Sequence, residues 1–195
     1  MSRVARVLFV THPEVIVDPA VPVPAWRLAP RGCARMAAFA ASGAAANVGA
    51  VYASGERKAA EAAAILAGRH GLAVTVVAEL HENDRTATGY LAAPEFEATA
   101  DRFFAEPLVS VRGWERAIDA QARIAAAVRA LVAADRSVGD LAIIAHGGVG
   151  ALLLCQLLRQ PIARRFDQPG RGGGNWFAFD RRTFALVHGW RPIDP

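Results

Sequence analysis

The sequence predicts an α/β fold, a three-layer sandwich in which helices flank a largely parallel central sheet. Short apolar runs that suit buried strands alternate along the chain with longer helical stretches, the pattern of parallel strands joined by crossover helices. The runs at 4–10 and 140–148 are almost continuously apolar, as expected for strands covered on both faces. With 195 residues, 53% of them hydrophobic, the chain can form one compact domain over 1–195.

Each expected element has its own signal in the sequence. A helix over 31–42 follows a Pro-rich segment, and Pro30 suits its first turn. A second helix, over 55–71, has Ser54 as its predicted N-cap and Gly71 as the residue that closes it. The other predicted helices are 114–134 and 149–159, the predicted strands are 4–10, 48–54, 72–80 and 140–148, and "NWFAFD" with "TFALVHGW" forms a terminal hairpin.

One segment does not fit the alternation of strands and helices. Residues 82–112 are more polar and irregular than the rest of the chain. We expect this segment to form a small cap-like insertion over a site.

Composition and charge favour a cytoplasmic protein that acts on small molecules. The net charge is +4 and the sequence pI is about 9.8, but charges of both signs are scattered without a dense basic run. No apolar run approaches the ~20 residues of a membrane span, and the first residues are too polar for a signal peptide. Cys33 and Cys155 lie far apart and form no metal-type pair. We therefore expect no nucleic-acid partner and no membrane partner.

Three polar residues stand at the carboxyl ends of predicted strands. They are His12, Ser54 and His146. Ligands of open α/β sheets bind at this edge, so the coincidence of three such residues predicts a site there. His12 is unusual because Thr11 precedes it and Pro13 follows it.

Six segments, in order along nearly the whole chain, resemble motifs of the histidine phosphatase superfamily, the phosphoglycerate-mutase-like family. None of them alone is specific, but their order makes the resemblance strong. The segments are "FVTHP" (9–13), "WRLAPRG" (26–32), "VYASGERKAAEAA" (51–63), "ELHEN" (79–83), "RGWER" (112–116) and "IIAHGGVGALL" (143–153).

This resemblance implies a phosphatase that hydrolyses a small phosphomonoester through a phosphohistidine, with no metal and no cofactor. His12 matches the family's nucleophile. Glu82 matches the acid that protonates the leaving oxygen and then activates water, with Asp84 as the second candidate. His146 would hydrogen-bond the phosphoryl group, helped by backbone N–H groups of the turn at Gly147 and Gly148.

The chain departs from the family pattern at three positions. Thr11 replaces an arginine and offers neither charge nor a bidentate fork, and Pro13 replaces a glycine. Lys58, the only lysine, stands at the second arginine of the family, and Arg57 lies next to it. The expected substrate-binding residues are Thr11, Arg57, Lys58 and Gly147, and further positive charge is available from Arg31, Arg164, Arg165 and Arg171.

We therefore expect a phosphatase of low activity, with a small phosphorylated metabolite as its partner. Mutase activity suits the chain less well, because the two-arginine clamp is incomplete and the cap is short. The alternative is a catalytically degenerate relative that binds a phosphorylated ligand without turnover. A nucleic-acid-associated protein is a weaker alternative that rests on the pI alone. The sequence also leaves room for a homodimer.

Overall fold

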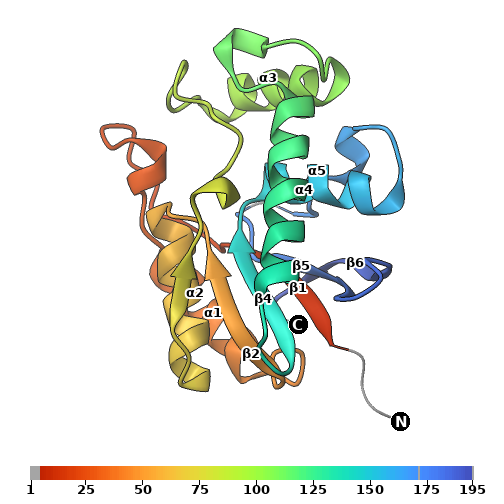
Figure 1. Cartoon of the computed structure of the whole chain (residues 1–195). Coiled ribbons are helices and arrows are strands. Elements are labelled where there is room, and N and C mark those ends of the chain that lie inside the picture. Colours follow the sequence, from red (N-terminus) through yellow and green to blue (C-terminus); the bar gives the residue numbers. More distant parts are fainter. Residues whose placement is uncertain (1–4, 171, 195) are drawn as a thin grey trace.

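The centre of the structure is a six-stranded sheet, seen in a computed structural model that describes residues 5–170 and 172–194 (Figure 1). The strand order is β3-β2-β4-β1-β5-β6; the first four strands run parallel, β5 runs antiparallel to β1, and β6 runs antiparallel to β5. This arrangement confirms the predicted fold class. The strands are β1 (Arg6–Thr11), β2 (Val48–Ala53), β3 (Val74–Val76), β4 (Asp140–Ala145), β5 (Asn175–Asp180) and β6 (Leu186–Pro192).

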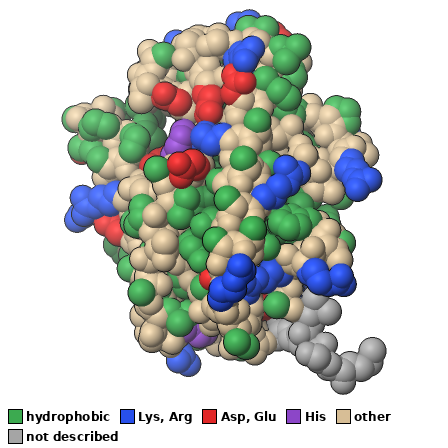
Figure 2. Space-filling view, viewed as in Figure 1, with side chains coloured by type: hydrophobic (Ala, Val, Ile, Leu, Met, Phe, Trp, Pro, Cys, Tyr) green, Lys and Arg blue, Asp and Glu red, His purple; other side chains and the backbone are tan. Residues whose placement is uncertain are grey.

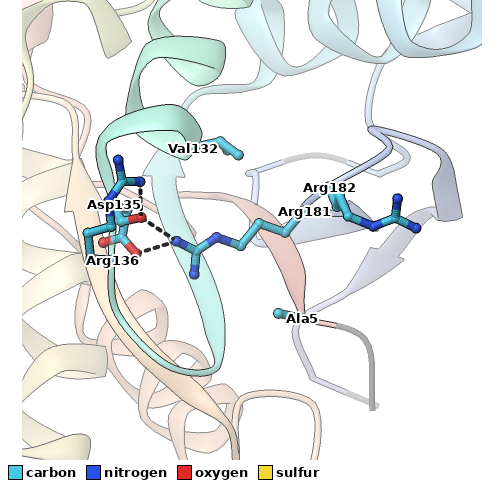
Figure 3. Close-up of a pocket in the computed structure, with 6 residues that line it drawn as sticks. All are labelled: Ala5, Val132, Asp135, Arg136, Arg181 and Arg182. Atoms are coloured by element: carbon cyan, nitrogen blue, oxygen red, sulfur yellow. Dashed lines mark hydrogen bonds and ion pairs between the residues drawn. The ribbon is translucent and has the colours of Figure 1, made fainter. Parts of the chain in front are cut away.

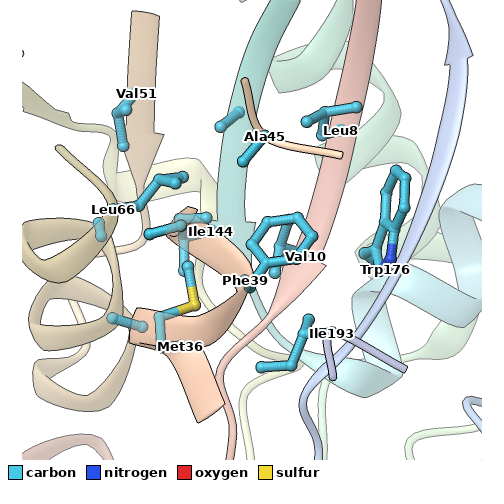
Figure 4. Packing of buried hydrophobic residues seen from close by; sticks show 14 of the residues in the cluster. Leu8, Val10, Met36, Phe39, Ala45, Val51, Leu66, Ile144, Trp176 and Ile193 are labelled. Carbon is cyan, nitrogen blue, oxygen red and sulfur yellow. The ribbon is translucent and has the colours of Figure 1, made fainter. Parts of the chain in front are cut away.

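Helices cover both faces of the sheet. Neighbouring residues of each central strand point to opposite sides, so the apolar side chains of these strands face helices on both sides. From β1, Leu8 and Val10 pack with α1 and α2, whereas Val7 and Phe9 pack with α4 and α5 (Figures 1 and 4). No helix of the described residues is long and apolar enough to cross a membrane. The helices are α1 (Pro30–Ala41), α2 (Arg57–His70), α3 (Ala93–Ala105), α4 (Ala117–Ala134) and α5 (Gly147–Leu158).

The segment 82–112, expected to be irregular, contains the whole of α3. This helix lies beyond the carboxyl ends of the parallel strands, beside the upper end of α4 (Figure 1). Its buried Phe103 and Phe104 pack against Trp114 and against Ala117 of α4. Burial of these aromatic side chains fixes α3 to the body of the protein.

Two local predictions were wrong. The strand expected over 72–80 is only the three residues of β3, which lies at the edge of the sheet and gives way to a 3-10 turn over Ala78–Leu80. Ser54 is not the N-cap of α2, which begins at Arg57 after Glu56. Gly71, in contrast, closes α2 in the left-handed conformation with φ of 66°, as expected.

Candidate active site

His12 and His146 lie side by side at the carboxyl edge of the sheet. β1 and β4 pair in parallel with Thr11 opposite Ala145, so the next residue of each strand is a histidine at the same level. The two ring centroids are 5.2 Å apart and the rings meet edge to face. This geometry confirms the expectation that the two apolar strands deliver their histidines to one place.

His12 is held as a neutral imidazole with a defined tautomer. Burial is the main cause that lowers its pKa from 6.5 to about 3, followed by the electrostatic effects of His146 and of the Lys58 ammonium. Its Nδ1 lies 2.9 Å from the carbonyl oxygen of Pro13. Because a carbonyl only accepts, Nδ1 carries the proton and the lone pair is on Nε2. His12 therefore presents a nitrogen that is a competent nucleophile at neutral pH.

The glycine-rich segment near the C-terminus holds the backbone of His12. The N–H of Gly174 donates to the carbonyl of His12 at 3.1 Å. Gly173 has φ of +73°, and a Cβ on it would lie 2.2 Å from the same carbonyl oxygen. Arg35 bonds the carbonyls of Gly173 and Gly174 and pairs with Glu14, which fastens this segment in place.

His146 is fully buried and faces two oxygen atoms. Its Nε2 lies 2.8 Å from Ser54 Oγ and 3.3 Å from Glu56 Oε1. Burial lowers the pKa of His146 to about 3; the charge of Glu56 opposes this shift, and that of Lys58 adds to it. Ser54 thus reaches the site as the strand-end argument predicts, whereas sequence analysis missed Glu56.

Glu56 forms an ion pair with Lys58, the residue at the position of the family's second arginine. Lys58 is only 3% exposed, and its ammonium binds the Glu56 carboxylate and the carbonyl of Val23. Burial opposes ionisation of Glu56, but His146 and Lys58 outweigh it and lower the Glu56 pKa to about 2. Arg57 is half exposed and pairs with Glu61, so the structure does not bring it to the histidines.

Glu82 lies at the amino end of α5, where anions are stabilised. Its carboxylate accepts the N–H groups of Gly148 at 3.0 Å and Val149 at 2.9 Å. The N–H of Glu82 itself donates to Glu56 Oε1 at 3.0 Å. We expected the N–H groups of Gly147 and Gly148 to face a phosphoryl group. The Gly148 N–H is instead bonded to Glu82, and Glu82 forms no hydrogen bond with the Gly147 N–H.

The side chain of Asp84, the second candidate for the acid, bonds the backbone and hydroxyl of Thr86 instead. The site then has one ammonium, Lys58, and two carboxylates, Glu56 and Glu82. With both histidines neutral at pH 7, the charge of these groups is +1 − 2 = −1. These three groups together are thus less attractive to a dianion than the two arginines of the family pattern, and Arg85, which also acts on the pKa of His146, lies in the adjoining cavity.

The remaining substrate-binding candidates contact other parts of the protein. Thr11 is fully buried, and its hydroxyl accepts the N–H of Asn175 at 3.0 Å. Arg164 pairs with Glu97 and Asp101, Arg165 lies over the ring of Phe166, and Arg31 is exposed near Glu14. Arg171 lies outside the described residues. These three described arginines therefore do not supply the missing charge.

A cavity of about 880 Å³ adjoins Glu56 and Glu82. The Pro-rich segment 19–24 forms an apolar wall, and Arg85 and Tyr90 contribute to the rest of the lining. The Arg85 guanidinium lies 5.2 Å from the ring centroid of Phe96 and 5.6 Å from that of Trp114. Acidic, basic and histidine side chains gather on this side of the molecule (Figure 2). Sequence analysis missed Arg85.

A second pocket, of about 420 Å³, lies at the other end of the sheet (Figure 3). It is lined by Ala5, Val132, Asp135, Arg136, Arg181 and Arg182, and Arg181 pairs with Asp135 at 2.6 Å. It contains no histidine, so the candidate site is at the histidine edge. Over residues 5–170 and 172–194, no group of three or more His, Cys, Asp or Glu side chains is arranged to hold a metal ion.

Comparisons with known proteins bear on the family and the fold. A family model described as histidine phosphatase superfamily (branch 1) matches residues 23–189. The comparison with curated proteins finds no similar sequence.

Solved structures share the fold over nearly the whole chain. Bacillus stearothermophilus YhfR has a TM-score of 0.79 at 20% identity, over 98% of both chains. A mycobacterial glucosyl-3-phosphoglycerate phosphatase in complex with inorganic phosphate has a TM-score of 0.74 at 24% identity, over 96% of this chain and 94% of that one. The alpha-ribazole phosphatase from Shigella flexneri has a TM-score of 0.71 at 16% identity, over 97% of each chain.

Proposed function

Because the chain belongs to the histidine phosphatase superfamily, branch 1, we propose that it hydrolyses a small phosphomonoester through a phosphohistidine on His12. The observation that carries the proposal is the state of His12, a neutral imidazole whose Nε2 is free to attack while Nδ1–H bonds Pro13. His146 lies beside it, where it can contact the same phosphoryl group.

The reaction divides into two balanced steps. Before the first step, the Glu82 carboxylate takes up a proton from solvent as the substrate binds. In the first step, Nε2 of His12 attacks phosphorus, the bond to the leaving oxygen breaks, and protonated Glu82 gives that oxygen its proton. In the second, Glu82 takes a proton from water, the water oxygen bonds phosphorus, and the P–N bond breaks. Inorganic phosphate leaves and His12 returns to the neutral form.

The cavity beside Glu56 and Glu82 is the proposed site of the leaving group. Its Pro-rich wall favours an apolar face on that group. Arg85 shows no ion pair with any described residue, and the rings of Phe96 and Trp114 hold it in the lining. It favours a leaving group that also carries a carboxylate or a second phosphate. The segment around α3 would then act as the cap.

We expect the turnover to be slow. An arginine that contacts the phosphoryl oxygens strengthens its bonds in the transition state, and loss of one such donor costs on the order of 10²-fold in kcat. Thr11 lacks that donor, and Glu56 neutralises Lys58.

The test compares wild type with His12→Ala on phenyl phosphate and on a panel of sugar and nucleoside phosphates. His70→Ala, at the far end of α2, is the matched control. We expect turnover in wild type and in the control but not in His12→Ala, and acid-labile phosphate on wild type quenched during the reaction. Equal activity in wild type and His12→Ala would refute the proposal. Bound phosphate without turnover in either form would indicate a binding protein instead.

A further inference from the structure

The side chain of Gln168 reaches the start of α5 from the loop that follows this helix. A Cβ placed on Gly147 would lie 2.2 Å from Gln168 Nε2 and 3.0 Å from its Cδ. The terminal amide therefore lies directly against the residue after His146. No motif in the sequence points to Gln168.

The hydrogen bonds around Gln168 fix the orientation of its amide. Asn175 Nδ2 donates to the carbonyl of Pro169 at 3.1 Å and to Gln168 Oε1 at 3.2 Å. The hydroxyl of Thr11 accepts the N–H of Asn175 and donates to Gln168 Oε1 at 2.7 Å. The oxygen of the amide therefore faces Thr11 and Asn175, and the NH₂ group faces the start of α5.

Nε2 is left with two N–H donors and no hydrogen-bond partner within the part of the chain that the structure describes. Its neighbours are the residues next to both histidines, since Thr11 precedes His12 and Gly147 follows His146. A long side chain at position 11 would extend along the path that the Thr11 hydroxyl and the Gln168 amide now fill.

We propose that Gln168 donates Nε2–H to an oxygen of the phosphoryl group at His12, in place of an arginine at position 11, and that Thr11 is the residue that positions it. The inference rests on the proposed function, and it names a phosphoryl-binding residue for that site. It also gives Thr11 a purpose, since a hydroxyl that accepts from Asn175 and donates to Gln168 orients the amide. A neutral donor bonds phosphoryl oxygens more weakly than a guanidinium, so the site keeps the contact without the charge.

The experiment measures binding of inorganic phosphate by calorimetry and turnover of phenyl phosphate in five forms. Gln168→Glu keeps the size of the side chain, removes both donors and adds a negative charge. Gln160→Glu adds the same charge at an exposed position and is the matched control. Thr11→Val removes the bond to Gln168 at nearly constant volume, and Thr11→Ser restores a hydroxyl. Wild type completes the set, and thermal unfolding shows that each variant is folded.

We expect Gln168→Glu to raise the Kd for phosphate at least tenfold and to lower kcat/KM on the order of 10²-fold, because one transition-state donor is lost. Thr11→Val should also raise the Kd for phosphate and lower kcat/KM, but by smaller factors. Thr11→Ser should restore both quantities toward their wild-type values. If Gln168 and Thr11 only stabilised the fold, their substitution would lower the melting temperature without these changes in phosphate Kd and kcat/KM.

The outcomes separate this inference from the proposed function. A phosphate Kd for folded Gln168→Glu within twofold of wild type overturns the assignment, whatever the turnover. Turnover absent from every form, with phosphate binding still weakened by Gln168→Glu, refutes hydrolysis and leaves the assignment standing. Failure of wild type to bind phosphate overturns both.

Discussion

Replacement of Glu56 by glutamine should strengthen phosphate binding, although Glu56 is buried and well bonded. The carboxylate binds Lys58 and lies 3.3 Å from His146 Nε2, so an anion that contacts His146 meets its negative charge at close range. Lys58 bonds Oε2 of Glu56 and the N–H of Glu82 bonds Oε1, so the single amide oxygen of glutamine keeps an acceptor for one of these two donors. The charge of Lys58, Glu56 and Glu82 together changes from −1 to 0.

The size of the effect follows from Coulomb's law. For charges about 5 Å apart and an effective dielectric constant of about 20, repulsion amounts to roughly 3 kcal/mol per pair of unit charges. Higher local screening halves this value, and 1.4 kcal/mol corresponds to about a tenfold change in Kd. We therefore expect Glu56→Gln to bind inorganic phosphate between ten and a hundred times more tightly than wild type.

The assay is calorimetric titration with inorganic phosphate at pH 7 and low ionic strength, with circular dichroism as the check on folding. Glu106→Gln removes one negative charge from an exposed pair with Arg102 and is the control. An unchanged or weaker affinity in folded Glu56→Gln would refute the reasoning. It would mean that Glu56 contributes to the anion site by holding Lys58, rather than opposing the anion.

Three further predictions concern pH, the leaving group and the glycine-rich segment. The pKa of His146 is 6.5 when unfolded and about 3 when folded, so between these values the unfolded chain binds the extra proton and stability falls as the pH falls. His146→Gln should reduce this slope by up to about 1.4 kcal/mol per pH unit in urea unfolding, and equal wild-type stability at pH 7 and pH 4.5 would contradict it. We expect wild type to prefer 4-carboxyphenyl phosphate over phenyl phosphate by about tenfold or more, because a charge-assisted hydrogen bond from Arg85 contributes that much. Arg85→Gln should remove this preference, whereas the control Arg102→Gln should keep it. A preference that survives in Arg85→Gln argues against an anionic leaving group. Gly173→Ala should displace His12 and lower kcat, because a Cβ there would meet the His12 carbonyl. Gly170 has φ of +75° but open space around a Cβ, so Gly170→Ala should introduce backbone strain without lowering kcat. Equal kcat in the two variants would show that the contact with His12 is unimportant.

The sequence predicts the long elements and the meeting of the histidines well, for a physical reason. Buried parallel strands are continuous apolar runs, and a histidine directly follows the last residue of both β1 and β4. The edge strand β3 is different, because it pairs on one side only and its apolar residues continue into a 3-10 turn. Apolar character alone does not distinguish a long buried strand from a short edge strand that leads into a 3-10 turn.

The parts of the site that sequence analysis missed depend on long-range contacts. Glu56 at the start of a helix has the pattern of an ordinary acidic first turn, and only the fold shows that it faces Lys58 and His146. Gln168 bonds Thr11 across 157 positions of sequence, from a loop whose side-chain directions no periodicity specifies. Arg85 is likewise set by the rings of Phe96 and Trp114.

The attachment of α3 bears on how this protein can change in evolution. Phe96 of α3 supports Arg85 at the leaving-group cavity, and Glu97 and Asp101 of α3 hold Arg164, four residues before Gln168. One helix thus supports both ends of the site. A substitution that shifts α3 alters recognition of the leaving group and of the phosphoryl group together, so the two cannot be selected separately by changes in this helix. New specificity is expected to arise instead in the Pro-rich segment 19–24, which lines the cavity and lies far from α3 in the sequence.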